Sequence, residues 1–369
     1  MRSRRERLLL LNLISDVGST QLRRLLDAVG DVDRLWASRA QELQQVAGIG
    51  PRLAQRIVAG CRDEERLENE LRLARRHHVT MITLEDPEYP QPLRAIPDPP
   101  LVLYLKGTLE PADEVAVGIV GARHASLYGI RCAEGLGYDL ALRGVTVVSG
   151  LARGIDGASH RGALKALGRT LAVLGNGLAC VYPTEHEDLS AQIAEQGALI
   201  SEYPMETPPL ARNFPRRNRL ISGLSLGVVV VEAASRSGAL ITADCALEQG
   251  REVFAVPGPM TAVTSQGTHQ LLKQGARLVT SVEDILEELH LSVHPGAGRA
   301  LSERIAGTTQ LLEPEQRVLG CVNDQPRYID AIAAQSGLDL PEVSSVLLQL
   351  ELKHVVQQLP GKQFVRKTL

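Results

Sequence analysis

The chain has 369 residues, too many for one ordinary domain and enough for two or three. Its formal net charge of −3 at pH 7 excludes a protein that binds polyanions over its whole surface, so a nucleic-acid surface could only be local. No run of about 18 uncharged apolar residues occurs, and the N-terminus has no apolar segment followed by a cleavage site. We therefore expect neither a membrane span nor a secretory leader.

Cysteine usage indicates a reducing compartment. The five cysteines form no CxxC pair and no metal-ligand spacing, and their number is odd; they are Cys61, Cys132, Cys180, Cys245 and Cys321. Thiols stay reduced in the cytosol, where disulfides are rare. The pattern predicts reduced, buried thiols in a cytoplasmic protein without a metal site, and nothing in the sequence indicates a bound cofactor.

Residues 1–78 are predicted to form a small helical domain. Apolar residues recur three and four positions apart, and two glycine-containing turns interrupt them. The second turn, "VAGIGPRLA", is typical of a helix-hairpin-helix motif, in which Gly48 and Gly50 allow close backbone approach and Pro51 begins the next helix. Such a turn can offer its N–H groups to a phosphate, or it can be a packing joint that contacts no ligand. The proline-rich segment 77–100 closes this domain.

Residues 79–290 alternate between strand and helix patterns. The expected strands are nearly continuous apolar runs: "VAVGIV", "VTVVSG", "TLAVLG", "ALISEY", "GVVVVEA", "EVFAVPG" and "RLVTS". Such strands form parallel sheets that are covered by helices on both faces. The pattern predicts an α/β, Rossmann-like domain whose ligand site lies at the carboxyl ends of the strands.

A third domain is expected at the C-terminus. Residues 291–307 contain glycine, alanine and proline and are predicted to be a linker. Residues 308–369 follow the order of a winged helix, with three helices and a hairpin, a turn at Gly337 and a hairpin tip at Pro360-Gly361. Its third helix, "PEVSSVLLQLEL", should bury Val343, Val346, Leu347 and Leu350. No Arg or Lys lies between Arg327 and Lys353, so this helix is predicted to be an accessory or protein-contact surface.

Three of the expected strands end in small residues. The first ends in "GARHAS", where Gly121, Arg123 and the helix N-cap Ser126 could form a phosphate site. The glycine spacing does not match a dinucleotide fingerprint. Alternatively, Arg123 pairs with a carboxylate and Ser126 only caps the helix.

The other two strand ends repeat this pattern. Gly150, Arg153 and Gly154 follow the second strand, and Ser235, Ser237 and Gly238 follow "VVVVEA". One such turn is ordinary packing, whereas three on one edge of a sheet indicate an extended anionic ligand or a nucleotide.

A cationic segment, residues 212–219, lies in an interval without Asp or Glu between Glu206 and Glu232. Its residues include the aromatic Phe214, the amide Asn218 and four arginines, Arg212, Arg216, Arg217 and Arg219. In single-strand binders, bases stack on aromatic rings while neighbouring cations hold the phosphates. The alternative is that Phe214 fills the core and the arginines face solvent.

A catalytic role is not supported by the sequence. Asp156 and His160 lie four residues apart near Ser149, but nothing in the sequence brings the three side chains into contact. Neither a GxSxG nucleophile elbow nor a Walker A sequence is present. We therefore expect a binding protein.

Five motifs resemble the DprA/Smf family of DNA-processing proteins, and the resemblance extends over nearly the whole chain. They are "GARHASLYG" (121–129), "SGLARGID" (149–156), "FPRRNRLISGLS" (214–225), "VVVEAASRSGALITA" (229–243) and "GREVFAVPG" (250–258). The family order is also similar: helical domain, Rossmann-like domain, winged helix. The resemblance implies a cytoplasmic protein, not an enzyme, that binds and protects single-stranded DNA, dimerises through the Rossmann-like domain, and loads RecA recombinase during natural transformation.

By this resemblance, Arg123, Phe214 and the run from Arg216 to Arg219 form the DNA pocket. The chain departs from the family where a lysine is common before the Phe: it has Ala211, and we expect Arg212 to take that phosphate. It also has His269 where Asn is commoner, which puts in doubt any role there beyond closing the fold.

Two other functions stay open. LOG-type nucleotide phosphoribohydrolases use a similar fold but need a PGGxGTxxE loop, where this chain has "EAASRSGALITADCALE". The winged helix could also belong to a transcription regulator.

Overall fold

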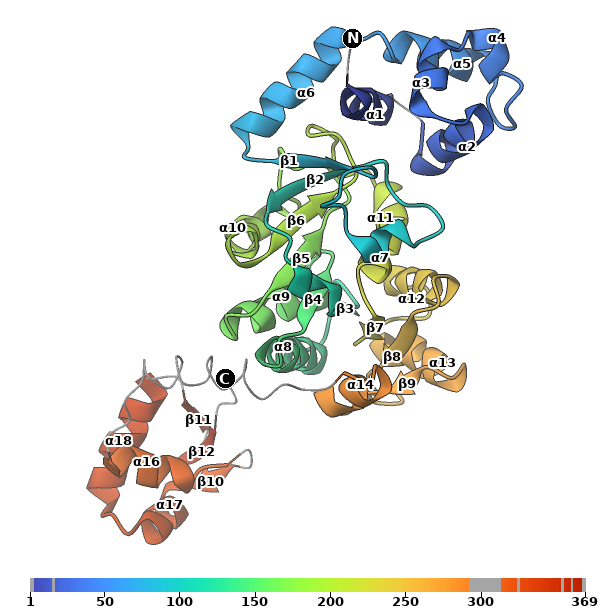
Figure 1. Cartoon of the computed structure of the whole chain (residues 1–369). Coiled ribbons are helices and arrows are strands. Elements are labelled where there is room, and N and C mark those ends of the chain that lie inside the picture. The colour runs from blue at the N-terminus through green and yellow to red at the C-terminus, as the bar shows by residue number, and fades with distance from the viewer. Residues whose placement is uncertain are drawn as a thin grey trace. The chain divides into compact units, whose positions relative to one another are not determined.

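The structure is a computed structural model that describes residues 3–14, 17–291, 313–323, 326–352, 355–359 and 361–366 (Figure 1). The chain divides into two compact units, residues 1–301 and residues 302–369. Apart from Leu291, the predicted linker 291–307 lies outside the described residues.

The N-terminal part of the first unit is helical, as predicted. Its helices are α1 (Arg4–Asn12), α2 (Ser19–Val29), α3 (Val32–Ala37), α4 (Ala40–Leu43), α5 (Pro51–Gly60) and α6 (Glu64–Arg76). Three of them, α1, α3 and α6, have N-cap residues whose side-chain oxygens accept a backbone N–H of the first turn; these residues are Ser3, Asp31 and Asp63. Helix α5 begins at Pro51 after the glycine turn.

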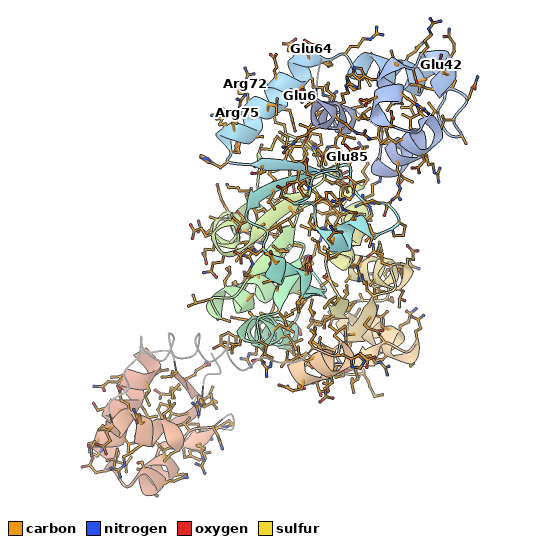
Figure 2. All side chains as sticks on the ribbon, viewed as in Figure 1. Glu6, Glu42, Glu64, Arg72, Arg75 and Glu85 are labelled. Atoms are coloured by element: carbon orange, nitrogen blue, oxygen red, sulfur yellow. The ribbon has the colours of Figure 1, made fainter. Side chains whose placement is uncertain are left out.

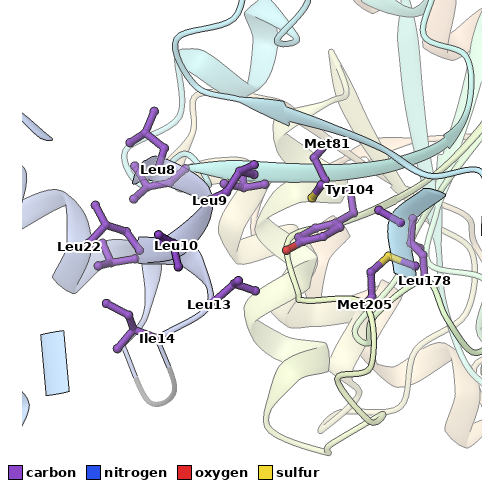
Figure 3. Close-up of a cluster of buried hydrophobic side chains, with 14 of the residues drawn as sticks. Leu8, Leu9, Leu10, Leu13, Ile14, Leu22, Met81, Tyr104, Leu178 and Met205 are labelled. Carbon is purple, nitrogen blue, oxygen red and sulfur yellow. The ribbon is translucent and has the colours of Figure 1, made fainter. Parts of the chain in front are cut away.

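These helices share a core with the sheet that follows them. Leucines of α1 lie against Met81 and Tyr104 of the first two strands, and Met205 completes the cluster (Figure 3). Glu70 of α6 is buried and accepts the Met205 N–H at 2.8 Å. On the same helix, Arg72 and Arg75 are involved in local hydrogen bonds and lie away from the sheet (Figure 2). The helical part is therefore packed as one body with the sheet.

A nine-stranded sheet organises residues 80–278, with the order β1-β2-β6-β5-β4-β3-β7-β8-β9. Its strands are β1 (Thr80–Thr83), β2 (Val102–Gly107), β3 (Ala116–Val120), β4 (Thr146–Ser149), β5 (Thr170–Val173), β6 (Ala198–Ser201), β7 (Gly227–Val230), β8 (Glu252–Ala255) and β9 (Arg277–Leu278). The seven strands from β6 to β9 in the sheet order are parallel, while β1 and β2 are antiparallel. The predicted Rossmann-like parallel sheet is confirmed.

The antiparallel strands β1 and β2 were not predicted from the sequence. Residues 80–83 lie inside the proline-rich segment expected to close the helical domain, yet they pair with β2, and β2 pairs with β6. The sequence does not indicate these strands for two reasons. Short strands between prolines carry little periodicity, and β2 pairs with β6, which lies nearly 100 residues later in the chain.

Helices cover both faces of the sheet (Figure 1). They are α7 (Gln91–Arg94), α8 (Leu127–Leu142), α9 (Ile155–Lys165), α10 (Glu187–Gln196), α11 (Asn213–Gly223), α12 (Gly238–Glu248), α13 (Gln266–Lys273) and α14 (Val282–Glu288). Short 3-10 turns lie at Pro111–Glu114, Thr184–His186 and Val263–Ser265. Helices α8, α9 and α14 bury apolar side chains on one face, and α7, α11, α12 and α13 on the other.

The second unit has the predicted winged-helix order. It contains α16 (Glu313–Gly320), β10 (Arg327–Tyr328), α17 (Ile329–Ser336), α18 (Leu340–Leu352), β11 (Val356–Leu359) and β12 (Gln363–Arg366), with the sheet order β10-β12-β11. Gly337 ends α17 with φ +70°, a conformation that favours glycine. Pro360 lies outside the described residues.

The cysteines are free, as predicted, but not all are buried. Cys61 and Cys321 are buried, Cys132 and Cys245 are partly buried, and Cys180 is exposed. Cys180 follows β5 in a loop, where periodicity carries no information about burial. Among the described residues, no helix combines the length and apolar character needed to cross a bilayer.

Candidate nucleic-acid interface

The candidate site lies where five neighbouring parallel strands end. In the sheet these strands are ordered β5, β4, β3, β7 and β8. The loops that follow them are residues 174–186, 150–154, 121–126, 231–237 and 256–265. We call this set of five loops the carboxyl edge. The sequence predicted three of these loops to share one edge, and the sheet order makes their strands, β4, β3 and β7, direct neighbours.

The carboxyl edge carries only two carboxylates, and both are engaged. Glu185 pairs with Arg153. Glu232 is buried, and its oxygens accept hydrogen bonds from the Ser126 hydroxyl at 2.6 Å and the Thr264 hydroxyl at 3.3 Å. Arg123 and Arg236 are exposed, and within the described residues neither has a carboxylate partner. The free charge of this edge is therefore positive.

Glycines let the loops pack tightly. Gly154 has φ +74°, and a Cβ atom there would come within 2.2 Å of the Ala122 carbonyl oxygen. At Gly121, a Cβ atom would come within 2.6 Å of Ile155. Because both positions lack a side chain, the turns after β3 and β4 lie directly against each other, with the backbone of Ala122 and Arg123 close to Gly154.

Phe214 lies at the centre of the site, in the first turn of α11, and is half-buried. Its ring backs onto Gly175, where a Cβ atom would come within 2.9 Å of the ring. The Tyr182 ring is tilted 47° to it with centroids 5.6 Å apart. The guanidinium carbons of Arg123 and Arg217 lie 5.1 Å and 5.9 Å from the Phe214 ring centroid. Of these neighbours, Arg123 is the exposed one.

Arg212 and Arg216 flank Phe214 and are exposed. Arg212 immediately precedes α11, and Arg216 lies in its first turn. Neither has a carboxylate partner within the described residues. Both side chains are therefore available to a ligand that reaches Phe214.

The position of Arg217 disagrees with the prediction that it belongs to the DNA pocket. It is buried, and its guanidinium donates hydrogen bonds to the carbonyl oxygens of Gly150, at 2.8 Å, and Val173. Burial lowers the pKa of this guanidinium to about 10, and the nearby Asp156 carboxylate opposes that shift. Arg217 thus joins α11 to the ends of β4 and β5 beneath the Phe214 ring.

Arg219 corrects the same expectation. Its buried guanidinium pairs with Asp98 and Glu202, each at 2.7 Å. Two carboxylates already neutralise its charge, so the Arg219 guanidinium is not available to bind a phosphate. Along α11, Leu220 and Arg219 face the core while Arg216 faces solvent.

The other predicted residues form the frame of the site. Ser126 caps α8 by accepting the Gly129 N–H at 3.1 Å, and Arg153 is paired with Glu185. Asn218 is buried and donates to the Gly238 carbonyl at 3.1 Å, which joins α11 to the first turn of α12. The Ser237 side chain accepts from Ala239 at 3.3 Å. These residues position the loops and leave Arg123, Arg212, Phe214 and Arg216 as the candidate contacts.

The Gly48–Gly50 turn does not belong to the carboxyl edge. It lies in the helical part, before α5, with φ +86° at Gly48. No atom lies within 4 Å of where a Cβ atom would stand at Gly48 or Gly50, so the turn is open. A role for it in holding a phosphate stays a prediction.

Ser149, Asp156 and His160 do not form a catalytic relay. The Ser149 hydroxyl donates to the Ile119 carbonyl at 2.6 Å. The His160 ring nitrogen Nδ1 lies 2.7 Å from the Thr170 hydroxyl. Burial raises the pKa of the Asp156 carboxyl, which accepts the Ala152 N–H at 3.4 Å. Across the described residues, no group of three His, Cys, Asp or Glu side chains could hold a metal ion.

Three site residues were not singled out from the sequence. Gly175 and Tyr182 lie in the loop "LGNGLACVYPTEH" after β5, and Arg236 lies after β7. An arginine between two serines in "SRSG" was a usable signal for Arg236. Nothing local indicates that Tyr182 packs against Phe214, because the two are 32 positions apart and meet only through the fold.

Fold and site together define a Rossmann-like protein with helical and winged-helix additions and a positively charged carboxyl edge. The sequence matches the family described as DNA recombination-mediator protein A over residues 80–290, the DprA winged helix domain over residues 306–362 and the SAM-like helix-hairpin-helix tandem over residues 8–63. The chain belongs to the DprA family of DNA-processing proteins.

Individual relatives agree. Protein Smf of Escherichia coli (strain K12) is 44% identical over 333 residues, which cover 88% of each chain. The structure of DNA processing protein A from Streptococcus pneumoniae matches with a TM-score of 0.68 and 34% identity, over 77% of this chain and 97% of that one. A structure that concerns the single-stranded DNA binding mode of DNA processing protein A from Helicobacter pylori matches with a TM-score of 0.53 and 30% identity, over 59% of this chain and 99% of that one.

Proposed function

We propose that this protein binds single-stranded DNA at the carboxyl edge, with Phe214 as the base platform. The observation that carries the proposal is the half-buried Phe214 ring beneath the exposed, carboxylate-free guanidinium of Arg123. The ring is fixed from behind by Gly175 and Arg217, so it is preorganised for stacking. The Helicobacter relative, whose structure concerns single-stranded DNA, supports the same ligand.

Charge and stacking have separate roles in this proposal. A base stacks at Phe214, and Arg123 moves from the ring to the adjacent phosphate. Arg212 and Arg216 neutralise flanking phosphates. Stacking tolerates any base and the backbone contacts carry no sequence information, so binding is expected to be insensitive to sequence.

The wider role follows from the family. We infer that the protein acts in the cytoplasm on DNA taken up in natural transformation, protects the single strand and loads RecA recombinase onto it. We further infer a homodimer formed through the Rossmann-like domain. Exposed Leu247 on α12 and Leu278 on the edge strand β9 offer apolar surface at that end of the sheet. Sedimentation over a range of protein concentrations tests the dimer. Adding RecA to single strands that this protein has already bound tests whether it loads the recombinase.

Substitution of Phe214 and Arg123 tests the binding site. Phe214→Ala should weaken oligo-dT binding by about 1–3 kcal/mol and leave the salt dependence unchanged, because a stacked base is lost and no charge is removed. Arg123→Ala should weaken binding and also reduce the slope of log K against log salt by about 0.7, the value for one phosphate on a single strand. Fluorescence anisotropy titrations at several salt concentrations measure both quantities.

Two controls accompany these variants. Arg161→Ala removes an exposed arginine from α9 away from the carboxyl edge and should leave the slope unchanged. Thermal melting is needed because loss of an aromatic side chain that is part of the core can cost about 3–5 kcal/mol of stability. The stacking proposal fails if Phe214→Ala lowers the melting temperature but folded molecules keep wild-type affinity.

A further inference from the structure

A fixed apolar surface continues the carboxyl edge beyond the proposed site. Four large apolar side chains there are exposed: Leu127 at 79% and Tyr128 at 45%, in the first turn of α8, and Met260 at 91% and Val263 at 62%, in the loop after β8. We call these four residues the β8-side patch. Exposed apolar groups that gather on one surface mark an interaction site more often than isolated ones do.

Hydrogen bonds hold the two halves of the patch together and keep them exposed. The Tyr128 hydroxyl donates to the Pro257 carbonyl at 2.7 Å, which joins α8 to the loop after β8. Thr264 and Ser126 both donate to Glu232, and a ring nitrogen of His269 lies 3.0 Å from the Gly258 carbonyl. The loop is therefore fixed at both ends, and the exposure of Met260 and Val263 is built into the fold.

We propose that the β8-side patch is a second base platform, on which the single strand continues after leaving Phe214. This inference rests on the proposed function. The sheet order places β5, β4, β3, β7 and β8 in a row, so the loop after β5, on which Phe214 packs, and the loop after β8, which carries Met260 and Val263, are four strand spacings, about 19 Å, apart. Arg123, beside Phe214, and Arg236 follow the intervening strands β3 and β7, and the two carboxylates of this edge are already engaged.

The chemistry of the patch favours bases over phosphates. The first helical turn of α8 would attract a phosphate, but the Glu232 carboxylate already accepts the Ser126 N–H at 2.9 Å and lies at that terminus. What remains outside is the apolar surface of Leu127, Met260 and Val263 and the ring of Tyr128. Apolar and aromatic groups flanked by arginines match the alternation of bases and phosphates along a single strand.

The test compares a short and a long oligo-dT on a patch variant. Oligomers of about 6 and about 15 nucleotides fall within the range of single-strand site sizes. The double variant Leu127→Ser with Met260→Ser should bind the short oligomer as the wild type does and the long one at least about fivefold more weakly, with an unchanged salt slope. Val115→Ser, an exposed apolar position immediately before β3 at the opposite edge of the sheet, is the matched control and should change neither.

A second measurement places the bases. Abasic sites at one end of the long oligomer should weaken its binding to the wild type by the same factor as the double substitution does. They should not weaken binding to the double variant further, because both changes remove the same interaction. The inference is overturned if the double variant binds both oligomers normally, or if it alters only the oligomeric state, which would make the patch a protein interface. Failure of the proposed function looks different, since Phe214→Ala would then leave affinity for the short oligomer unchanged.

Discussion

Two arginines of α11, three residues apart, have opposite environments. Arg216 is exposed without a carboxylate partner, whereas Arg219 is buried between Asp98 and Glu202. A phosphate contact requires an accessible charge, while a buried ion pair serves the fold. Similar local sequence therefore leaves one side chain exposed and available to a ligand and buries the other in the core.

Alanine substitutions should separate these two roles. Arg216→Ala should reduce the salt slope of oligo-dT binding by about 0.7 and leave the melting temperature nearly unchanged. Arg219→Ala should cost about 3–5 kcal/mol of stability, because Asp98 and Glu202 are left without their cation, and the slope per folded molecule should be preserved. Denaturant unfolding and salt titrations of the two variants measure this. A lower slope for Arg219→Ala at normal stability would return that residue to the DNA site.

The sequence could not reveal this difference between the two arginines. Which face of α11 is buried depends on the sheet beneath it, and Asp98 lies 121 positions from Arg219 in the chain. The strand ends could be predicted, because continuous apolar runs followed by glycine indicate parallel strands and the turns after them. The three loops predicted to share one sheet edge do share it, because their strands β4, β3 and β7 are neighbours; that they bind a ligand stays a prediction. The individual contacts of the candidate site depended on long-range packing that local patterns do not encode.

At the scale of elements, a buried histidine joins α9 to β5. The Thr170 hydroxyl donates to the Val147 carbonyl at 2.8 Å, so it accepts from His160 Nδ1, which must carry the proton. Within the described structure Nε2 has no partner. Burial lowers the pKa of His160 to about 3, and the nearby His186 adds to the effect. The neutral ring is therefore part of the folded state.

His160 should make the protein acid-sensitive. Its pKa is about 6.5 in the unfolded chain and about 3 in the folded one, so the unfolded chain binds the extra proton. Stability is then complete above about pH 6.5 and falls by up to about 1.4 kcal/mol per pH unit as the pH drops toward 3. His160→Asn keeps a donor near Nδ1 and should flatten the fall between pH 6 and pH 4, as measured by urea unfolding. The exposed His124→Asn should not, and equal slopes for wild type and His160→Asn would refute this account.

A second contact between elements joins the helical part to the sheet. Glu70 of α6 accepts the N–H of Met205, which lies in the segment between β6 and α11. Replacing Glu70 with Leu leaves this buried donor without an acceptor and should cost about 1–3 kcal/mol. Glu70→Gln keeps an acceptor oxygen and should cost less. Calorimetry of both variants, with the exposed Glu68→Leu as control, checks the order. Equal stabilities for the Leu and Gln variants would show that the hydrogen bond contributes little.

At the scale of the whole molecule, the chain consists of two units. In the first, the helical part and the sheet share one core, and the second is the winged helix. Leucines of α1 pack into the same cluster as strands β1 and β2 and helix α10, so the predicted division at residue 78 separates sequence patterns within one packed body. The winged helix instead has a core of its own, which includes Val318, Ile332, Leu347 and Phe364. Function can therefore be divided between the units by truncation.

The third helix of the winged helix is poorly suited to read duplex DNA. In α18, Val343, Val346, Leu347 and Leu350 are buried, as predicted, and Glu342, Ser344, Ser345, Leu348 and Gln349 are exposed. No lysine or arginine lies on this helix, so it offers no neutralisation of phosphates, and Glu342 repels them. Arg327, which precedes it, donates to the Cys321 carbonyl and to Gln335. An exposed Leu348 beside serine and glutamine is better suited to a protein contact than to a groove.

Removal of residues 302–369 should therefore leave single-strand binding nearly intact. Affinity for oligo-dT should change by no more than about threefold, or about 0.65 kcal/mol, because the exposed cations Arg123, Arg212 and Arg216 and the Phe214 ring all remain. The salt slope should be unchanged for the same reason. Melting of the remaining body should match the wild-type transition, since its core includes no residue of the removed unit. The isolated unit should show no sequence preference on duplex DNA at physiological salt. A nanomolar duplex site recovered for it by selection would contradict this and favour a transcription regulator.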